Sequence, residues 1–486
     1  MLNMAASSLR KVLVIVGTTG AGKTKLSIDL AKAVGGEIIN SDAMQMYRGL
    51  DIATAKITEQ EKEGVPHHLF DIVEPSGRCD VLEYKRRALS AIDDILARGK
   101  VPIIVGGTMY YTQSILWKSQ LLDDVPVKPD AHVIDDNATP EEIYAKLREV
   151  DPVMASRWHV NQVRRVRRSL EVFYQTGIRH SELIARQEEQ KKNTEKYFDA
   201  CAFWINCSKP VLADRLAKRV EKMMDTGLVD EITRLRADVK LNPPKYPTSG
   251  VTDGDESDGD DATEDHTVGI LQAIGYKEFA PYLDALEARE RAATEEEESA
   301  EVKADRDQEI SKLLDSCIDQ LNAATRQYAR RQLSWIRNRF VTRNIPVYQV
   351  DSSDVSKWED IVAKPAIEIA QSFLTGEPMT QFKSLQEAEP DKYAPISHDD
   401  KYRETFCEIC GNRKFIGKSQ WEMHLRSKGH KYHLKRIELE KQNPEWMQHR
   451  ANKAAKRAEV ERGVDNSETS SPKRAKVNVE DEEKST

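Results

Sequence analysis

Residues 12–24 read VLVIVGTTGAGKT, and this stretch decides the fold. A run of apolar, mostly β-branched residues is typical of a buried strand, and residues 25–34 predict an amphipathic helix. Between them lies the pattern GxxxxGK[ST], in which backbone N–H groups wrap an anion at a helix N-terminus, the lysine meets phosphate charge and the last hydroxyl reaches Mg²⁺. The stretch predicts a phosphate-binding loop but does not say which phosphate compound it binds. The candidate ligands are Gly17, Thr18, Thr19, Gly20, Ala21, Gly22, Lys23 and Thr24.

Polar residues follow two further predicted strands. Residues 36–42 (GEIINSD) place Asp42 at the carboxyl end of a short strand, where open α/β sheets place their ligands. Residues 101–108 (VPIIVGGT) end in Gly-Gly-Thr, where many ATP-hydrolysing loop proteins have a metal-binding acid. This departure weakens the ATPase interpretation, because glycines allow close backbone approach and Thr108 offers an anion a neutral hydrogen bond. Residues 203–207 and 346–351 are interpreted as further strands of the core.

Arginines gather on predicted helices. Residues 161–173 (NQVRRVRRSLEVF) put four arginines into five positions, and on a helix these fan over a broad arc that suits phosphate groups. Pairing of these arginines with nearby glutamates remains the alternative. Arg215 and Arg219 lie one turn apart, so both could reach a phosphate or a carboxylate, or pair at the surface. Residues 324–337 (ATRQYARRQLSWIR) mix arginines with aromatic rings, a combination that serves base stacking and phosphate neutralisation.

The composition excludes some classes of protein and favours a polyanionic partner. The formal net charge is -8, yet residues 401–457 carry 15 Lys and Arg against 6 Glu. Such a block suits nucleic acid, with a solvated helical face as the alternative. No apolar run is long enough to span a bilayer, so we expect no membrane partner. Six cysteines in 486 residues do not make a disulfide framework and indicate an intracellular protein with one metal site.

Residues 407–430 predict that metal site. Cys407 and Cys410 are separated by two residues, and His424 and His430 by five. Two thiolates and two imidazoles at this spacing make a closed tetrahedral Zn²⁺ site, and the segment looks like the matrin-type fingers associated with RNA binding. We expect the rings and apolar side chains of Trp421 and Leu425 to pack beneath the site.

Seven motifs occur in an order that resembles the tRNA dimethylallyltransferase family. They extend over residues 11–351, and the zinc finger makes the chain similar to the eukaryotic form of that family. The motifs are GTTGAGKT at Gly17, SDAMQMYRGLDIATAK at Ser41, PHHLFD at Pro66, VGGTMYY at Val105, NQVRRVRRSLEVFYQTG at Asn161, AIGYKEF at Ala273 and ATRQYARRQLSWIRNRF at Ala324.

The resemblance implies a reaction and a role for each matching residue. The family transfers a dimethylallyl group from dimethylallyl diphosphate to the exocyclic N6 amine of the adenine at position 37, beside the tRNA anticodon. By this match Asp42 is the general base, and Thr108 and Arg219 assist the diphosphate, with Arg215 as the rival of Arg219. The implied cofactors are a catalytic Mg²⁺ at Thr24 and a structural Zn²⁺. The implied tRNA contacts are Asp42, Ala43, Met44, Gln45, Thr108, Gln162, Val163, Arg164, Arg165, Val166 and Arg326. Ala43 stands where many relatives have serine.

The expected architecture is an α/β, P-loop NTPase-like parallel sheet flanked by helices, with a helical insertion and a C-terminal C2H2 zinc finger. The core covers residues 11–135, 201–247 and 268–351, and a helical tRNA-binding insertion covers 136–200. A disordered acidic insertion is expected at 248–267, a linker at 352–400, the finger at 401–437, and a basic helix with a disordered tail at 438–486. We expect a monomer in the cytoplasm with mitochondrial and nuclear pools. The rival hypotheses are a P-loop ATPase or nucleotide kinase acting on RNA, and an RNA-binding zinc-finger protein.

Overall fold

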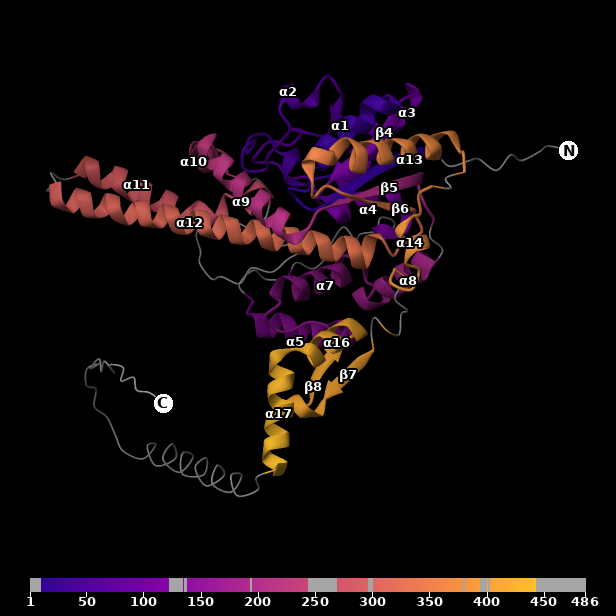
Figure 1. Ribbon diagram of the computed structural model, residues 1–486. Helices are drawn as coiled ribbons and strands as arrows, with labels where there is room; N and C mark the ends of the chain where they lie inside the picture. Colours follow the sequence, from indigo (N-terminus) through magenta and orange to yellow (C-terminus); the bar gives the residue numbers. More distant parts are fainter. Residues whose placement is uncertain are drawn as a thin grey trace, which may run out of the picture. The chain divides into compact units, whose positions relative to one another are not determined.

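The computed structural model describes residues 10–121, 134, 138–192, 195–243, 269–295, 300–378, 381–393, 400 and 403–442. The expected acidic insertion at 248–267 and the tail beyond residue 442 lie outside these ranges. The chain divides into two compact units, residues 1–395 and residues 396–486, and each is described by itself (Figure 1). Among the described residues, no helix has the length and apolar character needed to cross a membrane.

The first unit is built on a parallel sheet, as the sequence predicts. The sheet has six strands in the order β3-β2-β4-β1-β5-β6. In the central strand β1, Leu13 pairs with Ile103 of β4 on one side and with Cys201 of β5 on the other. Parallel strands have their carboxyl ends at one edge, so the loops after β1, β2 and β4 meet there. The strands are β1 Lys11–Gly17, β2 Gly36–Asn40, β3 His67–His68, β4 Val101–Gly106, β5 Asp199–Asn206 and β6 Val347–Asp351.

Both faces of the sheet are covered, as the continuous apolar run of β1 requires. Val12, Val14 and Val16 belong to one core cluster, whereas Leu13 and Ile15 belong to the other. Two helices supply the second cluster, α1 Lys23–Val34 and α13 Lys364–Thr375, and both lie along one face of the sheet in Figure 1. The first cluster is supplied by α3 Val81–Ala97, α4 Met109–Leu116, α9 Lys209–Asp225, α10 Leu228–Leu241, α11 Ala280–Glu295 and α12 Ala300–Trp335.

The expectation of a linker at residues 352–400 is wrong for its first part. The π-helical segment η7 Glu359–Ala363 and helix α13 place Val362, Ala366 and Ile369 in the core beside α1. These residues recur at intervals of three and four, which is the spacing of one face of a helix. The short helix α14 Leu385–Ala388 follows and contacts β6. The core therefore continues well beyond its predicted end at residue 351.

The predicted helical insertion has a core of its own. Its helices are α5 Pro140–Val150, α6 Pro152–Ala155, α7 Val163–Thr176 and α8 His180–Lys192. Leu147, Val166 and Leu170 are almost fully buried within this core. The buried carboxylate of Asp151 accepts hydrogen bonds from Met154 N (3.0 Å) and from Ser181 N (2.8 Å), which ties the start of α6 to α8. The arginines of α7 are thus mounted on a small helical cluster with its own apolar centre.

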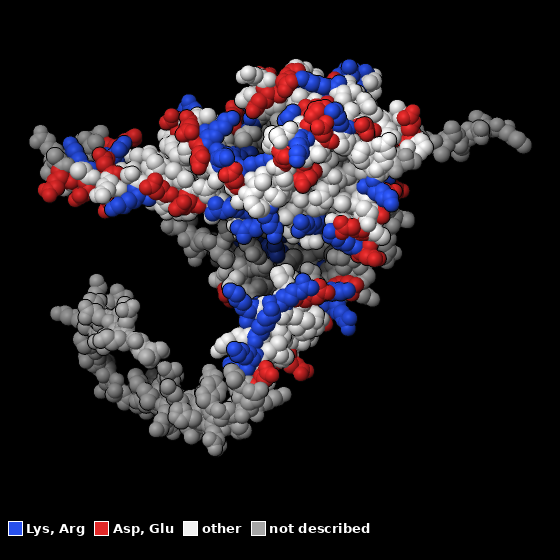
Figure 2. Space-filling model, viewed as in Figure 1, with Lys and Arg blue, Asp and Glu red and all other residues white. Residues whose placement is uncertain are grey.

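Helices α11 and α12 form a long antiparallel hairpin (Figure 1). Figure 2 shows blue Lys and Arg side chains gathered along the C-terminal half of α12, whereas red side chains are frequent along its N-terminal half. The π-helical segment η5 Ile336–Phe340 follows α12 directly. The remaining short helices of this unit are α2 Glu59–Lys62, η1 Met44–Met46, η2 Lys118–Gln120, η3 Gly269–Gln272, η4 Lys277–Phe279 and η6 Val355–Lys357.

The second unit is small and contains the predicted finger. The antiparallel strands β7 Glu404–Cys407 and β8 Arg413–Ile416 pair with each other, with the turn η8 Glu408–Cys410 between them. Two helices follow, α16 Lys418–Arg426 and α17 Lys428–Gln442.

Candidate active site and metal centre

The loop between β1 and α1 has the geometry of an anion site. Gly20 and Gly22 have φ values of 77° and 100°, in a region that other L-residues rarely adopt, so the loop requires glycine at both positions. Gly22 is the N-cap of α1, and the first N–H groups of a helix have no acceptor within it. The hydroxyl of Thr18 is buried and has no hydrogen-bond partner among the described residues. The loop therefore presents backbone donors and the positive end of a helix dipole to a bound anion.

Lys23 supplies a positive charge inside this loop. Its ammonium donates to the carbonyl oxygens of Gly17 (3.2 Å) and Thr18 (3.0 Å). Burial lowers the pKa of Lys23 to about 8, with the nearby charge of Asp42 acting in the opposite direction and that of Arg219 in the same direction. An anion that entered the loop would offer this ammonium a stronger partner than the two carbonyl groups.

Asp42 lies at the carboxyl end of β2, as predicted. The side chain of Asn40 brackets the turn, because its Oδ1 accepts from Asp42 N (2.9 Å) and its Nδ2 donates to Asp42 O (3.0 Å). The Asp42 carboxylate accepts from Met44 N at 3.2 Å. Burial raises the pKa of Asp42, while the charges of Lys23 and Arg219 act to lower it. A carboxylate that is held rigidly and has a raised pKa is suited to accept a proton.

The Gly-Gly-Thr end of β4 packs tightly against this turn. A Cβ atom at Gly106 would lie 2.1 Å from the carbonyl oxygen of Ser41, so the close approach is to the neighbouring backbone. The Thr108 hydroxyl accepts from Ala43 N at 3.2 Å, and Thr108 N donates to Ser41 O at 3.2 Å. The structure thus places Thr108 beside the turn that carries Asp42.

The structure separates the two rival arginines of α9. The guanidinium of Arg219 acts electrostatically on both Lys23 and Asp42, and burial lowers its pKa. The guanidinium of Arg215 instead donates to Ser352 Oγ (3.3 Å) and Ser352 O (2.5 Å), and Ser352 Oγ donates to Ala21 O at 2.7 Å. Arg219 therefore lies near Lys23 and Asp42, whereas Arg215 is linked through Ser352 to the backbone of the phosphate loop.

The segment after Asp42 is held by contacts that the sequence analysis missed. Gln45, one of the predicted tRNA contacts, donates from Nε2 to Thr54 O at 3.1 Å. The buried carboxylate of Glu231, on α10, accepts from Ile52 N (2.8 Å) and Ala53 N (2.9 Å). Glu231 belongs to none of the quoted motifs, so no local pattern could have assigned it. Ala43 and Met44 are half-buried and pack against the first core cluster.

The predicted contacts on α7 do not all face outward. Arg164 and Arg165 are exposed, and the guanidinium of Arg165 lies 5.0 Å from the centroid of the Trp158 ring. Gln162 is the N-cap of α7, and its Oε1 accepts from the backbone N of residue 159 at 3.0 Å. Val163 is half-buried against the insertion core. Val166 is 0% exposed, so its side chain is not available for the predicted tRNA contact.

Arg326, another predicted tRNA contact, lies on α12 rather than on α7, and its side chain is exposed.

The residues at the start of α1 fit a Mg²⁺ ion only if a bound phosphate supplies most of its ligands. Thr24 is exposed in the first turn, next to Lys23, and offers a single hydroxyl. Mg²⁺ is commonly bound through substrate phosphates with only one or two protein oxygens. A cation here would therefore depend on a phosphate ligand for most of its coordination.

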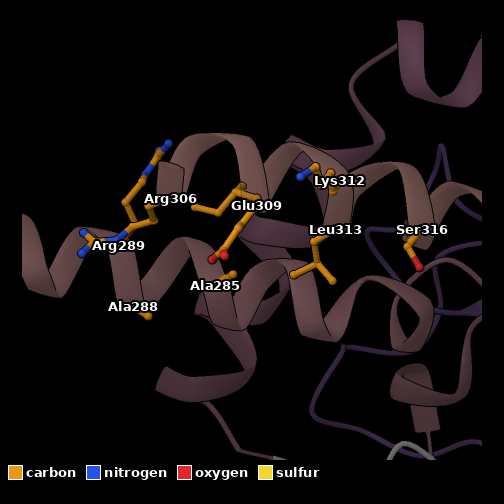
Figure 3. A pocket seen from close by; sticks show the side chains of 9 residues that line it. Ala285, Ala288, Arg289, Arg306, Glu309, Lys312, Leu313 and Ser316 are labelled. Carbon is orange, nitrogen blue, oxygen red and sulfur yellow. The ribbon is translucent and has the colours of Figure 1, made fainter. Parts of the chain in front are cut away.

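A separate cavity of about 650 Å³ lies between α11 and α12 (Figure 3). None of its lining residues is a predicted site residue. They are Ala285, Ala288, Arg289, Arg306, Glu309, Ile310, Lys312, Leu313 and Ser316.

The metal centre of the second unit brings together the four predicted ligands. The ligand atoms of Cys407, Cys410, His424 and His430 all lie within 4.8 Å of one another. Two thiolates and two imidazoles in such a cluster fit a structural Zn²⁺ ion.

The packing beneath this centre differs in part from the expectation. The ring of Phe415, which the sequence analysis missed, stacks on His424 with centroids 4.0 Å apart. Trp421 lies beside Phe415, with ring centroids 5.9 Å apart, as expected. Leu425 is 38% exposed, so the expectation that it packs beneath the metal is wrong. Phe415 lies on β8, between the cysteine pair and the histidine pair in the sequence. The spacing of the four metal ligands does not predict that its ring packs on His424.

Comparison with known families gives two matches. Residues 45–339 match the model of the IPP transferase family, and residues 405–430 match a C2H2-type zinc finger. The first match covers more than half of the chain, including the segment after Asp42, α7 and α12. The second includes all four candidate zinc ligands.

Individual relatives agree with these matches. The chain is 35% identical over 440 residues to a tRNA dimethylallyltransferase of Mus musculus, covering 87% of this chain and 86% of the relative. It is 36% identical to the enzyme of Homo sapiens, with the same coverage. It also resembles a crystal structure described as a eukaryotic dimethylallyltransferase acting on tRNA. That likeness has a TM-score of 0.64 at 30% identity and covers 90% of this chain and 100% of the other.

Proposed function

This chain belongs to the tRNA dimethylallyltransferase family, and from that premise we propose how its site transfers a dimethylallyl group to an adenine of tRNA. The observation that carries the proposal is the position of Asp42, a half-buried carboxylate whose charge interacts with both Lys23 of the phosphate loop and Arg219. One group can thus act on the nucleophile while its neighbours act on the leaving group.

The loop binds the diphosphate of dimethylallyl diphosphate. Its backbone donors and the ammonium of Lys23 recognise phosphate charge whatever group is attached to it. As the bond from the allyl carbon to oxygen breaks, negative charge builds on the diphosphate, and these donors stabilise that charge. Arg219 lies close enough to Lys23 to act on the same charge. A Mg²⁺ ion at Thr24, bound mainly through the diphosphate, would add to this stabilisation.

Asp42 acts on the adenine. The N6 amine of adenine is a weak nucleophile because its lone pair is delocalised into the ring. The nitrogen forms a bond to the allyl carbon, the bond to diphosphate breaks, and Asp42 accepts one of the two N6 protons. Thr108 supports this arrangement through its hydrogen bond to Ala43 N, in the turn that carries Asp42. The reacting base must leave its stack in the anticodon loop to reach this carboxylate.

The tRNA is held over several elements. Ala43, Met44 and Gln45 follow Asp42 directly and contact the reacting base and its neighbours. Exposed arginines on α7 and Arg326 on α12 contact the phosphate backbone. We further propose a monomer in the cytoplasm, with mitochondrial and nuclear pools. The basic cluster at residues 472–476 (PKRAK) supports the nuclear pool.

One assay separates the transferase from its rivals. The purified chain is incubated with labelled dimethylallyl diphosphate and unmodified tRNA, and label in the RNA is counted beside phosphate release from ATP. Label in the RNA supports the proposal. ATP-dependent phosphate release without label would favour a P-loop ATPase, and RNA binding with neither activity would favour an RNA-binding zinc-finger protein.

A further inference from the structure

Gln332 lies inside the site although none of the roles above uses it. It is on α12, is 4% exposed, and is separated from the phosphate loop by more than three hundred residues of sequence. Its Oε1 accepts from Thr19 N at 2.8 Å, and its Nε2 donates to Gly107 O at 3.0 Å. A single amide group therefore joins the loop after β1 to the end of β4.

Gly107 is the point where this amide meets the proposed base. A Cβ atom at Gly107 would lie 2.4 Å from Gln332 Nε2, 3.1 Å from Asp42 Oδ2 and 3.4 Å from Tyr328 Oη. Tyr328 lies one turn before Gln332 on α12, and its hydroxyl is 3.5 Å from Gly107 O. The side chain of Gln332 and the carboxylate of Asp42 thus both lie close to Gly107, on the side toward which its Cβ would point.

We propose that Gln332 is a positioning residue for the transfer reaction, one that holds the phosphate loop at a fixed spacing from Asp42. It acts through Thr19 and Gly107, and the inference rests on the proposed function of the loop and of Asp42. An amide is required because one end must accept from an N–H group and the other must donate to a carbonyl group. A carboxylate can do only the first, and a thioether is a poor substitute for both.

The backbone N–H of Thr19 is an expected donor to the diphosphate, but it is already bonded to Gln332. Because Gln332 already accepts the N–H of Thr19, that amide belongs to the framework of the loop, whereas the donors at the start of α1 remain for the diphosphate. The reacting carbon is attached to the diphosphate, so a shift of the loop away from Asp42 would also misplace the carbon relative to the adenine amine.

Two substitutions in the full-length chain test this role. Gln332→Met keeps the length of the side chain and removes both hydrogen bonds. We expect the KM for dimethylallyl diphosphate to rise about tenfold and kcat to fall about tenfold, with the Kd for tRNA unchanged. Gln320→Met is the matched control, because Gln320 is exposed on the same helix and should leave all three constants unchanged. Circular dichroism shows whether each variant folds.

Gln332→Glu keeps the acceptor for Thr19 N and adds a negative charge beside Asp42. The charged groups that face Asp42 are Lys23 from α1 and Arg219 from α9, and the hydroxyl of Tyr328 faces it from α12. A further carboxylate there raises the pKa of Asp42, so the acid limb of kcat/KM should move to a pH about one unit higher. A side chain that lay away from Asp42 would not move this limb.

The outcomes are distinguishable. Wild-type kinetic constants in a folded Gln332→Met variant, or an unmoved acid limb in Gln332→Glu, would overturn the positioning role while leaving the proposed function intact. Should Gln332→Met fail to fold, the acid limb of Gln332→Glu decides. A wild-type chain that transfers no label would instead overturn the proposed function itself.

Discussion

Asp42 and Lys23 carry opposite charges in one half-buried site, where loss of solvent disfavours both charged forms. Burial raises the pKa of the carboxylate and lowers that of the ammonium. Their mutual attraction opposes both shifts, and the charge of Arg219 and the backbone hydrogen bonds to Asp42 also act to lower the pKa of Asp42. Burial thus shifts the pKa values of the two groups toward each other. This suits a reaction in which one group must accept a proton and the other must hold a diphosphate.

Replacement of Asp42 tests its role as the base. In Asp42→Ala we expect transfer to fall by a factor of about 10² to 10⁴, the range that loss of a general base allows, with tRNA binding nearly intact. Single-turnover transfer of label and a filter-binding Kd for tRNA measure the two quantities. Asp315→Ala, an exposed aspartate on α12, serves as the control. Unchanged turnover in Asp42→Ala would remove Asp42 from the mechanism.

The pH dependence of kcat/KM for dimethylallyl diphosphate should be bell-shaped. The acid limb lies above the ordinary carboxylate value, because Asp42 has a raised pKa and must be ionised to accept a proton. The alkaline limb begins near pH 8, because Lys23 loses its charge there.

Lys23→Arg is the informative variant for the alkaline limb. A guanidinium stays charged well beyond this range, so the alkaline limb should move to higher pH even if the overall rate falls. An alkaline limb that stayed near pH 8 in this variant would assign it to another group.

At the scale of single residues, sequence reasoning found the charged groups but not the groups that hold them. Lys23 and Asp42 follow strands in recognisable motifs, and the structure brings them together with Arg219. Gln332 lies within an arginine-rich helix, and Glu231 lies in none of the seven motifs. Both act by hydrogen bonds to backbone that is far away in the sequence, and a local pattern carries no information about such partners.

Strand β2 leads to Asp42, and Glu37, a residue of this strand, ties it to its neighbours. The Glu37 carboxylate accepts hydrogen bonds from Arg98, at the C-terminus of α3, and its Oε2 lies 2.7 Å from His68 Nε2 of β3. The hydrogen bonds from Arg98 are the main cause that lowers the pKa of Glu37 to about 2, and the contact with His68 adds to them. A folded-state pKa below the unfolded one contributes stability at neutral pH and loses it as the pH falls from about 4.5 towards 2.

Substitution of Glu37 should therefore be costly in a pH-dependent way. We expect Glu37→Gln to lower the free energy of unfolding by about 2–3 kcal/mol at neutral pH. The difference from wild type should shrink below about pH 4.5. Urea unfolding at two pH values measures it. Glu83→Gln is the control, because Glu83 pairs with Arg86 and Arg87 near the surface and should cost under about 1 kcal/mol. Equal costs at both pH values would contradict the account.

At the scale of elements, the strands of the core and the helical insertion were predictable, whereas the end of the core was not recognised. Strong apolar runs predict β1 and β4. The chain after β6 was interpreted as a linker, yet Trp358 donates to Asp29 at 2.7 Å and its ring approaches Gly22 of the phosphate loop. The segment after β6 belongs to the core because it packs against α1, which comes from the start of the chain. This contact joins residues far apart in the sequence, and the polar residues around the segment gave no local sign of it.

At the scale of the whole molecule, the second unit adds a basic, metal-stabilised module to the enzyme core. Deletion of residues 401–486 removes the surplus of positive charge carried by residues 401–457. We expect the KM for tRNA to rise and its salt dependence to flatten, with kcat nearly unchanged, because phosphate contacts release counterions in proportion to their number. Transfer assays over a range of salt concentrations test this.

A point variant separates charge from folding in that unit. Cys407→Ser keeps every positive charge but removes a zinc ligand, so the module should unfold without its metal. Loss of tRNA affinity in this variant would show that the folded finger contributes beyond its charge. A deletion that left both the KM and the salt dependence unchanged would argue against any role of the unit in binding tRNA.

The central claim is that the phosphate loop holds the leaving group while Asp42 selects an adenine amine as the nucleophile. The most direct measurement locates the transferred group: labelled dimethylallyl diphosphate is reacted with unmodified tRNA, and the RNA is digested to nucleosides and separated. The account predicts that all label migrates as N6-dimethylallyladenosine from position 37, and that tRNA with guanine at that position takes up none. Label on another nucleoside, or undiminished label in the guanine variant, would contradict it.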